Sequence, residues 1–302
     1  MSPVQRVIKY FAMAFAAMLM VGILSGVIAV LAGIGEGTQL FTSDREYQSF
    51  VEEFDRVTNL DITNYSGKFT IKTGDTDKIV VSATEVPDTI SVSVTDNGTL
   101  VIKDEGNDGW FFSIITFGFD LNIRTEIEVT LPANFVADHA YLDNGSGSFR
   151  IEALKAKVLE YDGGSGAFVG NNITAEEAKL SLGSGASLLT YVEFGEGKLK
   201  SGSGAVQIED SRFTDMKIDS GSGAIRFEGS LLGTTIIESG SGSATYDIED
   251  PIDKYSINAE DGSGGIWING NRVEKIKDSN SSMPYKLDID GGSGKVTLNF
   301  SR

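Results

Sequence analysis

The side chains best placed to do chemistry in this sequence are carboxylates that recur beside a Gly-Ser-Gly tripeptide. The tripeptide occurs eight times, and the residue two positions before its first glycine is acidic in six of the eight copies. Calcium takes roughly six to eight oxygen ligands, which stacked carboxylates can supply. Because Ser181 and Lys200 interrupt the series, we favour a solvated acidic face over a calcium site. The candidate calcium ligands are Asp143, Asp162, Asp219 and Glu238.

The eight serines of the tripeptide are candidate nucleophiles. A hydrolase elbow has the pattern G-x-S-x-G, which none of the eight copies fits. The sequence has one histidine, His139, and no cysteine, so it lacks a base for these serines and a thiolate for a metal site. We therefore predict that the protein is not an enzyme, that it has no cofactor, and that the serines are turn residues.

An apolar segment, WFFSIITFGF at residues 110–119, has three interpretations: an exposed binding patch, a loop that touches the membrane, or a cover for the core. Exposed apolar patches mark contacts with partners, whereas a stack of repeats needs a cover at its open end. We favour the cover. The aromatic residues concerned are Trp110, Phe111, Phe112, Phe117 and Phe119.

The tripeptides themselves define a structural repeat. The first five intervals between successive first glycines are identical, and the last two are longer, which predicts loop insertions there. Apolar residues alternate with polar ones on both sides of each tripeptide, which predicts two short strands per repeat. The alternation changes phase at the tripeptide, so the chain must turn there, and a missing Cβ permits unusual dihedrals or close stacking. The turn glycines are Gly145, Gly147, Gly164, Gly166, Gly183, Gly185, Gly202, Gly204, Gly221, Gly223, Gly240, Gly242, Gly262, Gly264, Gly292 and Gly294.

Repeats of this size cannot bury their own apolar face and must stack on their neighbours. We therefore predict an all-β fold, a single-stranded parallel β-helix (β-solenoid) with 19-residue coils over residues 136–302. Residues 57–135 hold less regular strand patterns and predict an irregular β cap with a degenerate first coil. Residues 36–56 are expected to form a juxtamembrane segment with a short helix, because Tyr47, Phe50, Val51 and Phe54 have the spacing of one helix face.

The beginning of the sequence predicts a membrane anchor. Residues 10–35 carry no formal charge, which is long enough for one transmembrane signal-anchor helix and too long for a signal peptide core. Arg6 and Lys9 precede this stretch, so residues 1–9 are expected to be cytoplasmic and the β domain extracytoplasmic. The whole chain carries a net charge of −18, which argues against a nucleic-acid partner.

The motifs resemble a bacterial family of β-solenoid domains known by the name "putative adhesin". The resemblance rests on LDITNYSGKFTI at residues 60–71, TLVIK at 99–103, LP at 131–132 and the eight tripeptides, and covers about residues 57–302. It implies a stacked-coil fold, attachment through a single N-terminal membrane helix, and no catalytic residues.

We expect a membrane-anchored, non-catalytic binding module at the cell surface. Its partners are expected to be the membrane, through the single N-terminal span, and an envelope polymer or envelope protein. One alternative is a scaffold that self-associates through solenoid ends, because the last residues follow a strand pattern with no capping helix. A second is an accessory protein of envelope-stress sensing, and a third is a polysaccharide-acting enzyme.

Overall fold

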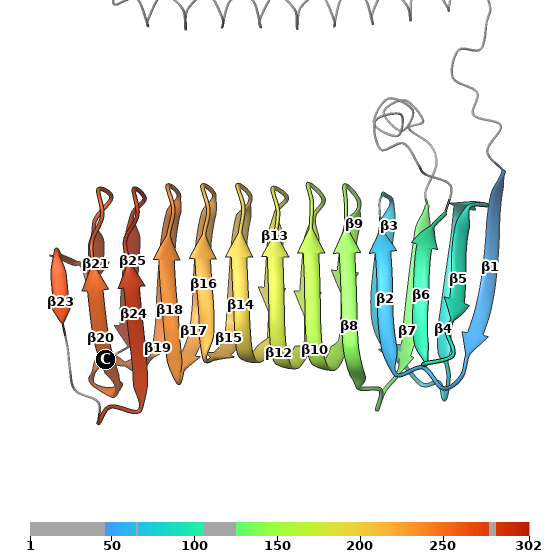
Figure 1. The fold of residues 1–302 in the computed structure, drawn as a ribbon, viewed down its shortest axis with the longest axis horizontal. Helices are drawn as coiled ribbons and strands as arrows, with labels where there is room; N and C mark the ends of the chain where they lie inside the picture. The colour runs from blue at the N-terminus through green and yellow to red at the C-terminus, as the bar shows by residue number, and fades with distance from the viewer. Residues whose placement is uncertain (1–45, 65, 106–124, 278–281, 302) are drawn as a thin grey trace, which may run out of the picture. The chain divides into compact units, whose positions relative to one another are not determined.

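The structure, a computed structural model, describes residues 46–64, 66–105, 125–277 and 282–301 (Figure 1). Within these ranges the chain forms one mostly parallel sheet of 25 strands and a single 3₁₀ helix, η1 (Ile252–Lys254). The predicted all-β, mostly parallel fold is therefore confirmed. The predicted tail at residues 1–9 and transmembrane helix at 10–35 lie outside the described residues, in which no helix is long and apolar enough to cross a membrane.

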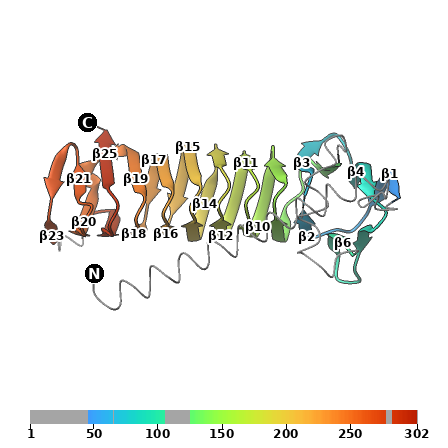
Figure 2. The same cartoon turned by 90° about the horizontal axis from the view of Figure 1, so that it is seen from above.

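Most strands belong to two parallel ladders, which lie on opposite sides of a stack of coils (Figure 2). The first ladder contains β2 (Asn59–Asn64), β6 (Thr99–Asp104), β8 (Ala137–Asn144), β10 (Leu154–Gly163), β12 (Ile173–Leu182), β14 (Glu193–Ser201), β16 (Met216–Ser220), β18 (Thr234–Ser239), β20 (Tyr255–Glu260) and β24 (Tyr285–Asp290). The second contains β3 (Lys68–Gly74), β7 (Glu126–Pro132), β9 (Ser148–Ile151), β11 (Phe168–Asn171), β13 (Ser187–Thr190), β15 (Ala205–Thr214), β17 (Ala224–Leu232), β19 (Ser243–Pro251), β21 (Ile266–Ile268) and β25 (Val296–Ser301). The remaining strands are β1 (Tyr47–Phe54), β4 (Ile79–Pro87), β5 (Ile90–Val94), β22 (Asn271–Val273) and β23 (Lys275–Lys277).

The register of the ladders reproduces the sequence repeat. Leu154 pairs with Ile173 in the first ladder, and Phe168 pairs with Ser187 in the second, so each residue faces its equivalent in the next repeat. Inward side chains of both ladders form one buried cluster, because alternate residues of each strand point to the same face. Aromatic rings stack between coils within it, such as Phe69 on Phe149 with ring centroids 5.0 Å apart.

The Gly-Ser-Gly turns line one edge of the coil stack (Figure 1). A Cβ on Gly166 would lie 1.9 Å from the carbonyl oxygen of Gly147, and one on Gly204 would lie 1.8 Å from that of Gly185. None of the sixteen turn glycines has a positive φ. Close stacking, not an unusual dihedral angle, is therefore what requires glycine here, and only glycine permits backbone at this separation.

The coils do not stack in chain order at either end. β6 and β7 lie outside β2 and β3, which pair with them on one side and with β8 and β9 on the other. At the opposite end, β24 lies between β18 and β20, and β25 lies between β19 and β21. In the long intervals after Gly240 and Gly262, the chain therefore first forms the end coil with β20 and β21. It then returns to form β24 and β25 between that coil and the coil of β18 and β19. The expected insertion in the second of these contains β22 and β23.

The helix predicted from Tyr47, Phe50, Val51 and Phe54 is wrong. These residues lie in β1, which pairs antiparallel with β4, while β4 pairs antiparallel with β7 at the end of the second ladder. An unpaired β4 would expose a row of backbone groups, and the aromatic and β-branched residues of the segment suit a strand that covers it. Phe50 and Phe54 pack against the core, whereas Val51 is 68% exposed.

The outermost strands at the other end are short. β23, with the sequence Lys-Ile-Lys, pairs antiparallel with β20, and β22 pairs antiparallel with β21. Short, lysine-bearing edge strands discourage pairing with further chains. The last strand of the sequence, β25, is internal to the stack and does not form its open end.

Candidate functional site

The predicted acidic row exists in space. Asp143 pairs with Asp162, and Asp219 pairs with Glu238, on neighbouring strands of the first ladder. Ser181 lies between the two pairs, on the strand next to Asp162, and Lys200 lies beside Asp219. The four candidate calcium ligands are therefore brought together as two pairs and not as one cluster.

Lysines occupy one of the two pairs. Lys198 pairs with Asp219, and Lys217 pairs with Glu238. Burial opposes the ionised form of Asp219, but the hydrogen bonds from Lys198 and Glu238 and the charges of Lys198 and Lys217 together outweigh it and lower the pKa of this carboxyl. Within the described ranges, no three His, Cys, Asp or Glu side chains are grouped so that they could hold a metal ion.

The remaining predicted residues are the aromatic residues of the segment 110–119, the single histidine and the serines of the Gly-Ser-Gly turns. The aromatic residues from Trp110 to Phe119 lie outside the described residues. His139 is half-exposed on the first ladder, with its Nε2 3.9 Å from Glu160 Oε1. The serines of the Gly-Ser-Gly turns are exposed along the turn edge, whereas His139 lies near the start of β8.

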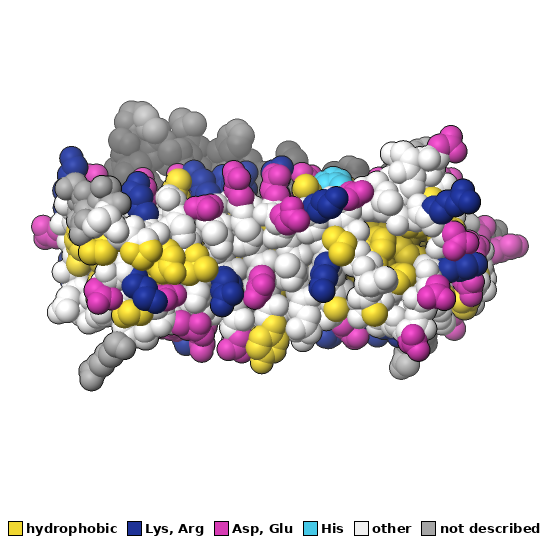
Figure 3. All heavy atoms as spheres, turned by 90° about the horizontal axis from the view of Figure 1, so that it is seen from below, with side chains coloured by type: hydrophobic (Ala, Val, Ile, Leu, Met, Phe, Trp, Pro, Cys, Tyr) yellow, Lys and Arg dark blue, Asp and Glu magenta, His cyan; other side chains and the backbone are white. Residues whose placement is uncertain are grey.

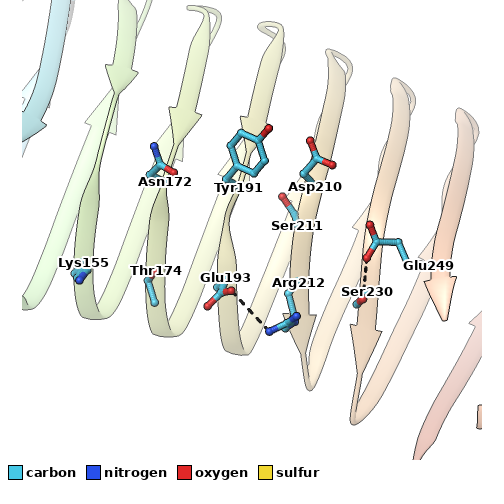
Figure 4. Close-up of a pocket in the computed structure, with 10 residues that line it drawn as sticks. All are labelled: Lys155, Asn172, Thr174, Tyr191, Glu193, Asp210, Ser211, Arg212, Ser230 and Glu249. Atoms are coloured by element: carbon cyan, nitrogen blue, oxygen red, sulfur yellow. Dashed lines mark hydrogen bonds and ion pairs between the residues drawn. The ribbon is translucent and has the colours of Figure 1, made fainter.

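A groove that the sequence analysis did not identify lies at the corner where second-ladder strands pass to first-ladder strands (Figure 4). This corner groove has a volume of about 440 Å³. It is defined by its lining residues, which are Lys155, Asn172, Thr174, Tyr191, Glu193, Asp210, Ser211, Arg212, Ser230 and Glu249.

The coil corner provides one wall of the groove. Asn172, Tyr191 and Asp210 lie one coil apart from each other, and all three are in the left-handed region, with φ of 50°, 56° and 48°. Asparagine and aspartate tolerate this conformation, whereas a bulky residue there is an outlier. The corner therefore holds Tyr191 in a strained backbone with its side chain 56% exposed.

Residues that follow the corner along the chain provide the other wall. Thr174 pairs with Glu193, and Glu193 pairs with Arg212, so their side chains form a second row beside the corner (Figure 4). The Arg212 guanidinium lies 3.8 Å from the Glu193 carboxylate, which is an ion pair too long for a hydrogen bond. Both side chains remain more than half exposed, so each keeps free hydrogen-bonding capacity.

A β-bulge lies at the centre of the groove. The register between β15 and β17 shifts between Ile208 and Ser211, so that Ser211 faces Gly229, one position short of the regular repeat. Ser211 stands where neighbouring coils have Ile173 and Val192, and its Oγ donates to the carbonyl of Glu209 at 2.6 Å. A bulge redirects the side chains beside it, which here are those of Asp210 and Arg212.

The charge of the groove is mixed. Two cations, Lys155 and Arg212, face three carboxylates, those of Glu193, Asp210 and Glu249. This mixture agrees with the wider surface at this side of the coils, where acidic and basic side chains are interspersed and hydrophobic ones form separate groups (Figure 3). The groove therefore offers hydrogen-bonding groups of both kinds around one aromatic ring.

A second depression of about 520 Å³ lies on the first ladder around Gly197 and is lined by four lysines, Lys179, Lys198, Lys200 and Lys217. Lys179 lies 2.7 Å from Glu177, Lys198 pairs with Asp219, and Lys217 pairs with Glu238. Because three of the four lysines already have a carboxylate partner, this depression is weaker as an anion site than its lysine content alone indicates.

The fold and the groove define the class of the protein: a stack of parallel coils that presents a polar groove. The chain belongs to the family described as Toastrack DUF4097, which matches residues 57–299. The match identifies no catalytic family. Among curated proteins, none matches the chain.

The chain is similar to solved bacterial structures at low sequence identity. One from Parabacteroides distasonis, described as a "putative adhesin", is 14% identical, with a TM-score of 0.43 over 84% of this chain and 98% of that one. A second from the same species, described as a "putative lipid binding protein", is 16% identical, with a TM-score of 0.45 over 87% and 98%. A cell adhesion protein, also described as "putative", from Clostridium sporogenes is 17% identical, with a TM-score of 0.26 over 85% and 100%.

Proposed function

We propose that this chain is a membrane-anchored, extracytoplasmic β-solenoid that acts as a non-catalytic, adhesin-like binding module. Its 19-residue coils form a single-stranded parallel β-helix, and the corner groove contacts a polymer or protein of the cell envelope. The observation that carries the proposal is Tyr191, an exposed ring on a strained corner, surrounded by polar side chains with unused hydrogen-bonding capacity. Strain of this kind is concentrated at functional sites.

The sequence outside the described residues supports the location. An uncharged stretch at residues 10–35 follows Arg6 and Lys9, which favours a cytoplasmic N-terminus and an exported β domain. Apart from these two cations and the uncharged stretch, the rest of the chain carries a net charge of −20. Such a surface is repelled by acidic lipid head groups, so it favours contact with envelope material over contact with the bilayer.

The alternative of a self-associating scaffold has less support. Self-association through the solenoid ends requires an open end at the last strand. However, β25 is internal to the stack, and the outer strands β22 and β23 have three residues each. Short edge strands with charged residues oppose end-to-end pairing.

Sedimentation with isolated cell envelopes tests the proposal. The full-length protein, purified in mild detergent, is mixed with envelopes of the source bacterium and pelleted. The wild type and the control Leu188→Ala, which removes an exposed side chain from β13, are expected to pellet equally. Tyr191→Asn is expected to stay in the supernatant. Equal pelleting of wild type and Tyr191→Asn, or no pelleting of either, would contradict the proposal.

Protease treatment of intact cells tests the location. Protease added from outside the cytoplasmic membrane is expected to degrade the β domain and leave an epitope tag at the N-terminus intact. Protection of the β domain until the membrane is lysed would place it in the cytoplasm and contradict the proposal.

A further inference from the structure

We propose that the corner groove binds a linear glycan without net negative charge, and that the glycan lies along the axis of the coil stack. The inference deepens the proposed function, on which it rests, by naming the chemical class of the ligand. It depends on four properties of the groove: an aromatic platform, polar groups around it, their repetition from coil to coil, and the balance of charge.

The platform is the ring of Tyr191. Sugar rings present C–H groups on their faces and hydroxyl groups at their edges, so they pack on an aromatic face while their hydroxyls stay free to hydrogen bond. The Tyr191 side chain is 56% exposed and points away from the core between Asn172 and Asp210 (Figure 4). A tyrosine ring also loses little conformational entropy on binding, because it has few rotatable bonds.

The polar groups around the ring are incompletely satisfied. The Asn172 amide donates one long bond of 3.5 Å to the carbonyl of Glu152. Among the described residues, none forms a hydrogen bond or ion pair with the Asp210 carboxylate, which lies one coil from Tyr191. Glu193 and Arg212 contact each other only at 3.8 Å. Planar carboxylate, amide and guanidinium groups can each hydrogen bond to two neighbouring hydroxyls.

These groups repeat along the stack. Asn172, Tyr191 and Asp210 form one row, while Thr174, Glu193 and Arg212 form a second row beside it. Neighbouring coils are separated by about 4.8 Å, the spacing of hydrogen-bonded strands. That advance is comparable to the length of one sugar unit in an extended polysaccharide. A linear glycan along the axis therefore meets a new set of polar groups at each successive unit.

The charge and lining of the groove exclude other occupants. A polyanion would approach Glu193, Asp210 and Glu249 with only Lys155 and Arg212 in compensation. A peptide helix needs an apolar groove for its apolar face, and Tyr191 is the one large hydrophobic residue that lines this groove. An uncharged or amino-bearing glycan meets neither obstacle.

Titration of the full-length protein in detergent tests the ligand class. The probes are uncharged hexasaccharides of N-acetylglucosamine, glucose, mannose and galactose. Inorganic polyphosphate is the anionic comparison. We expect at least one saccharide to bind, and polyphosphate to bind more weakly than that saccharide. No saccharide binding, or tighter binding of polyphosphate, would overturn the inference.

Three variants assign the binding to the groove. Tyr191→Asn uses the residue that the preceding coil has at Asn172, so the corner accommodates it, and we expect about tenfold weaker saccharide binding. Tyr191→Phe keeps the ring and is expected to bind within about threefold of wild type. Leu188→Ala, on an exposed strand position, is the matched control and is expected to bind as wild type. Unchanged binding by Tyr191→Asn would overturn the inference.

Envelope sedimentation after protease digestion of the envelopes separates this inference from the proposed function. If the groove binds a glycan, digestion leaves the pelleting of wild type unchanged. If digestion abolishes pelleting that still depends on Tyr191, the binding module stands and the glycan inference fails.

Discussion

A Cβ atom on Gly185 would lie 1.7 Å from the carbonyl oxygen of Gly166 in the neighbouring coil. Backbone atoms cannot move aside as a flexible side chain can, because each turn is hydrogen-bonded to its neighbours, as in the 2.8 Å bond from Ser184 N to Gly164 O. The close approach of successive turns therefore explains why glycine recurs at both ends of the Gly-Ser-Gly tripeptide. The serine between the glycines points to solvent in every copy and is free of this constraint.

Gly185→Ala is expected to lower the free energy of unfolding by about 2–3 kcal/mol, since a side chain forced into a close-packed contact strains the structure. Ser184→Ala, at the neighbouring exposed position, is expected to change it by less than about 0.5 kcal/mol. Urea denaturation of the full-length protein measures both. Equal effects of the two substitutions would contradict the stacking argument.

Asn144→Ala is expected to destabilise the junction between the cap and the regular coils. Asn144 is fully buried, accepts a hydrogen bond of 2.9 Å from the amide of Asn64, and donates to the carbonyl of Gly147. Its removal leaves a buried amide unsatisfied, which costs about 1–3 kcal/mol of unfolding free energy. Asn299→Ala, which breaks an exposed bond to Asp247, is the control, and an equally large loss there would argue against this role of burial.

Asp143→Asn is expected to stabilise the protein at neutral pH. Burial, and then the charge of Asp162, raise the pKa of the Asp143 carboxyl. The folded state therefore holds the proton of Asp143 more tightly than the unfolded state does. Ionisation of Asp143 consequently lowers the free energy of unfolding above the raised pKa, and this loss of stability disappears as the pH falls through that pKa. Because the group is partly solvated, we expect a gain of about 0.5 kcal/mol at pH 7 and none near pH 3.

Asp219→Asn is expected to change the free energy of unfolding at neutral pH in the opposite direction to Asp143→Asn. Burial is outweighed by the hydrogen bonds and charges of Lys198 and its neighbours, which lower the pKa of Asp219. Its ionised form therefore stabilises the fold above the ordinary carboxyl pKa, and this contribution is lost as the pH falls through the lowered value. The substitution is expected to destabilise the protein at pH 7 and to have little effect at the acid end. Denaturation at a series of pH values measures both variants, and the same sign for both at pH 7 would contradict the assignment.

Tyr191→Asn is expected to leave the stability unchanged or to raise it by up to about 1 kcal/mol, because asparagine tolerates the left-handed corner better than tyrosine does. The ring is mostly outside the core, so little buried surface is lost. Urea denaturation checks this result. A loss of more than about 1 kcal/mol would show that the ring supports the fold and would weaken its assignment as a binding platform.

The sequence predicts each coil but not the order in which the coils stack. Alternation around Gly145 and Gly164 indicates strand positions and inward faces, because the period of two is visible in the chain itself. Nothing in that pattern distinguishes β24 beside β18, which the structure has, from β20 beside β18, which chain order would give, since all coils present similar edges. The helix expected around Phe50 and Phe54 failed for a related reason: strand pairing with β4 is a tertiary contact that helical spacing does not reveal.

The corner groove was not predicted, although its signal is present in the sequence. Tyr191 lies one repeat after Asn172 and one repeat before Asp210, so an aromatic residue interrupts a series of turn-forming residues. The sequence contains no comparable signal for the bulge between Ile208 and Ser211, because the bulge arises from the register between β15 and β17. The acidic row was predicted correctly in position, but its ion pairs with Lys198 and Lys217 depend on side chains from neighbouring coils.

Hydrogen exchange of the full-length protein, with and without an uncharged hexasaccharide that binds it, tests most directly whether the corner groove is the binding site. We predict slower exchange of backbone amides at residues 190–193 and 209–212 in the presence of glycan, with the Gly-Ser-Gly turns and the end strands β5 and β23 unchanged. Protection confined to the turn edge or to the end strands, with no change at the corner, would contradict the account.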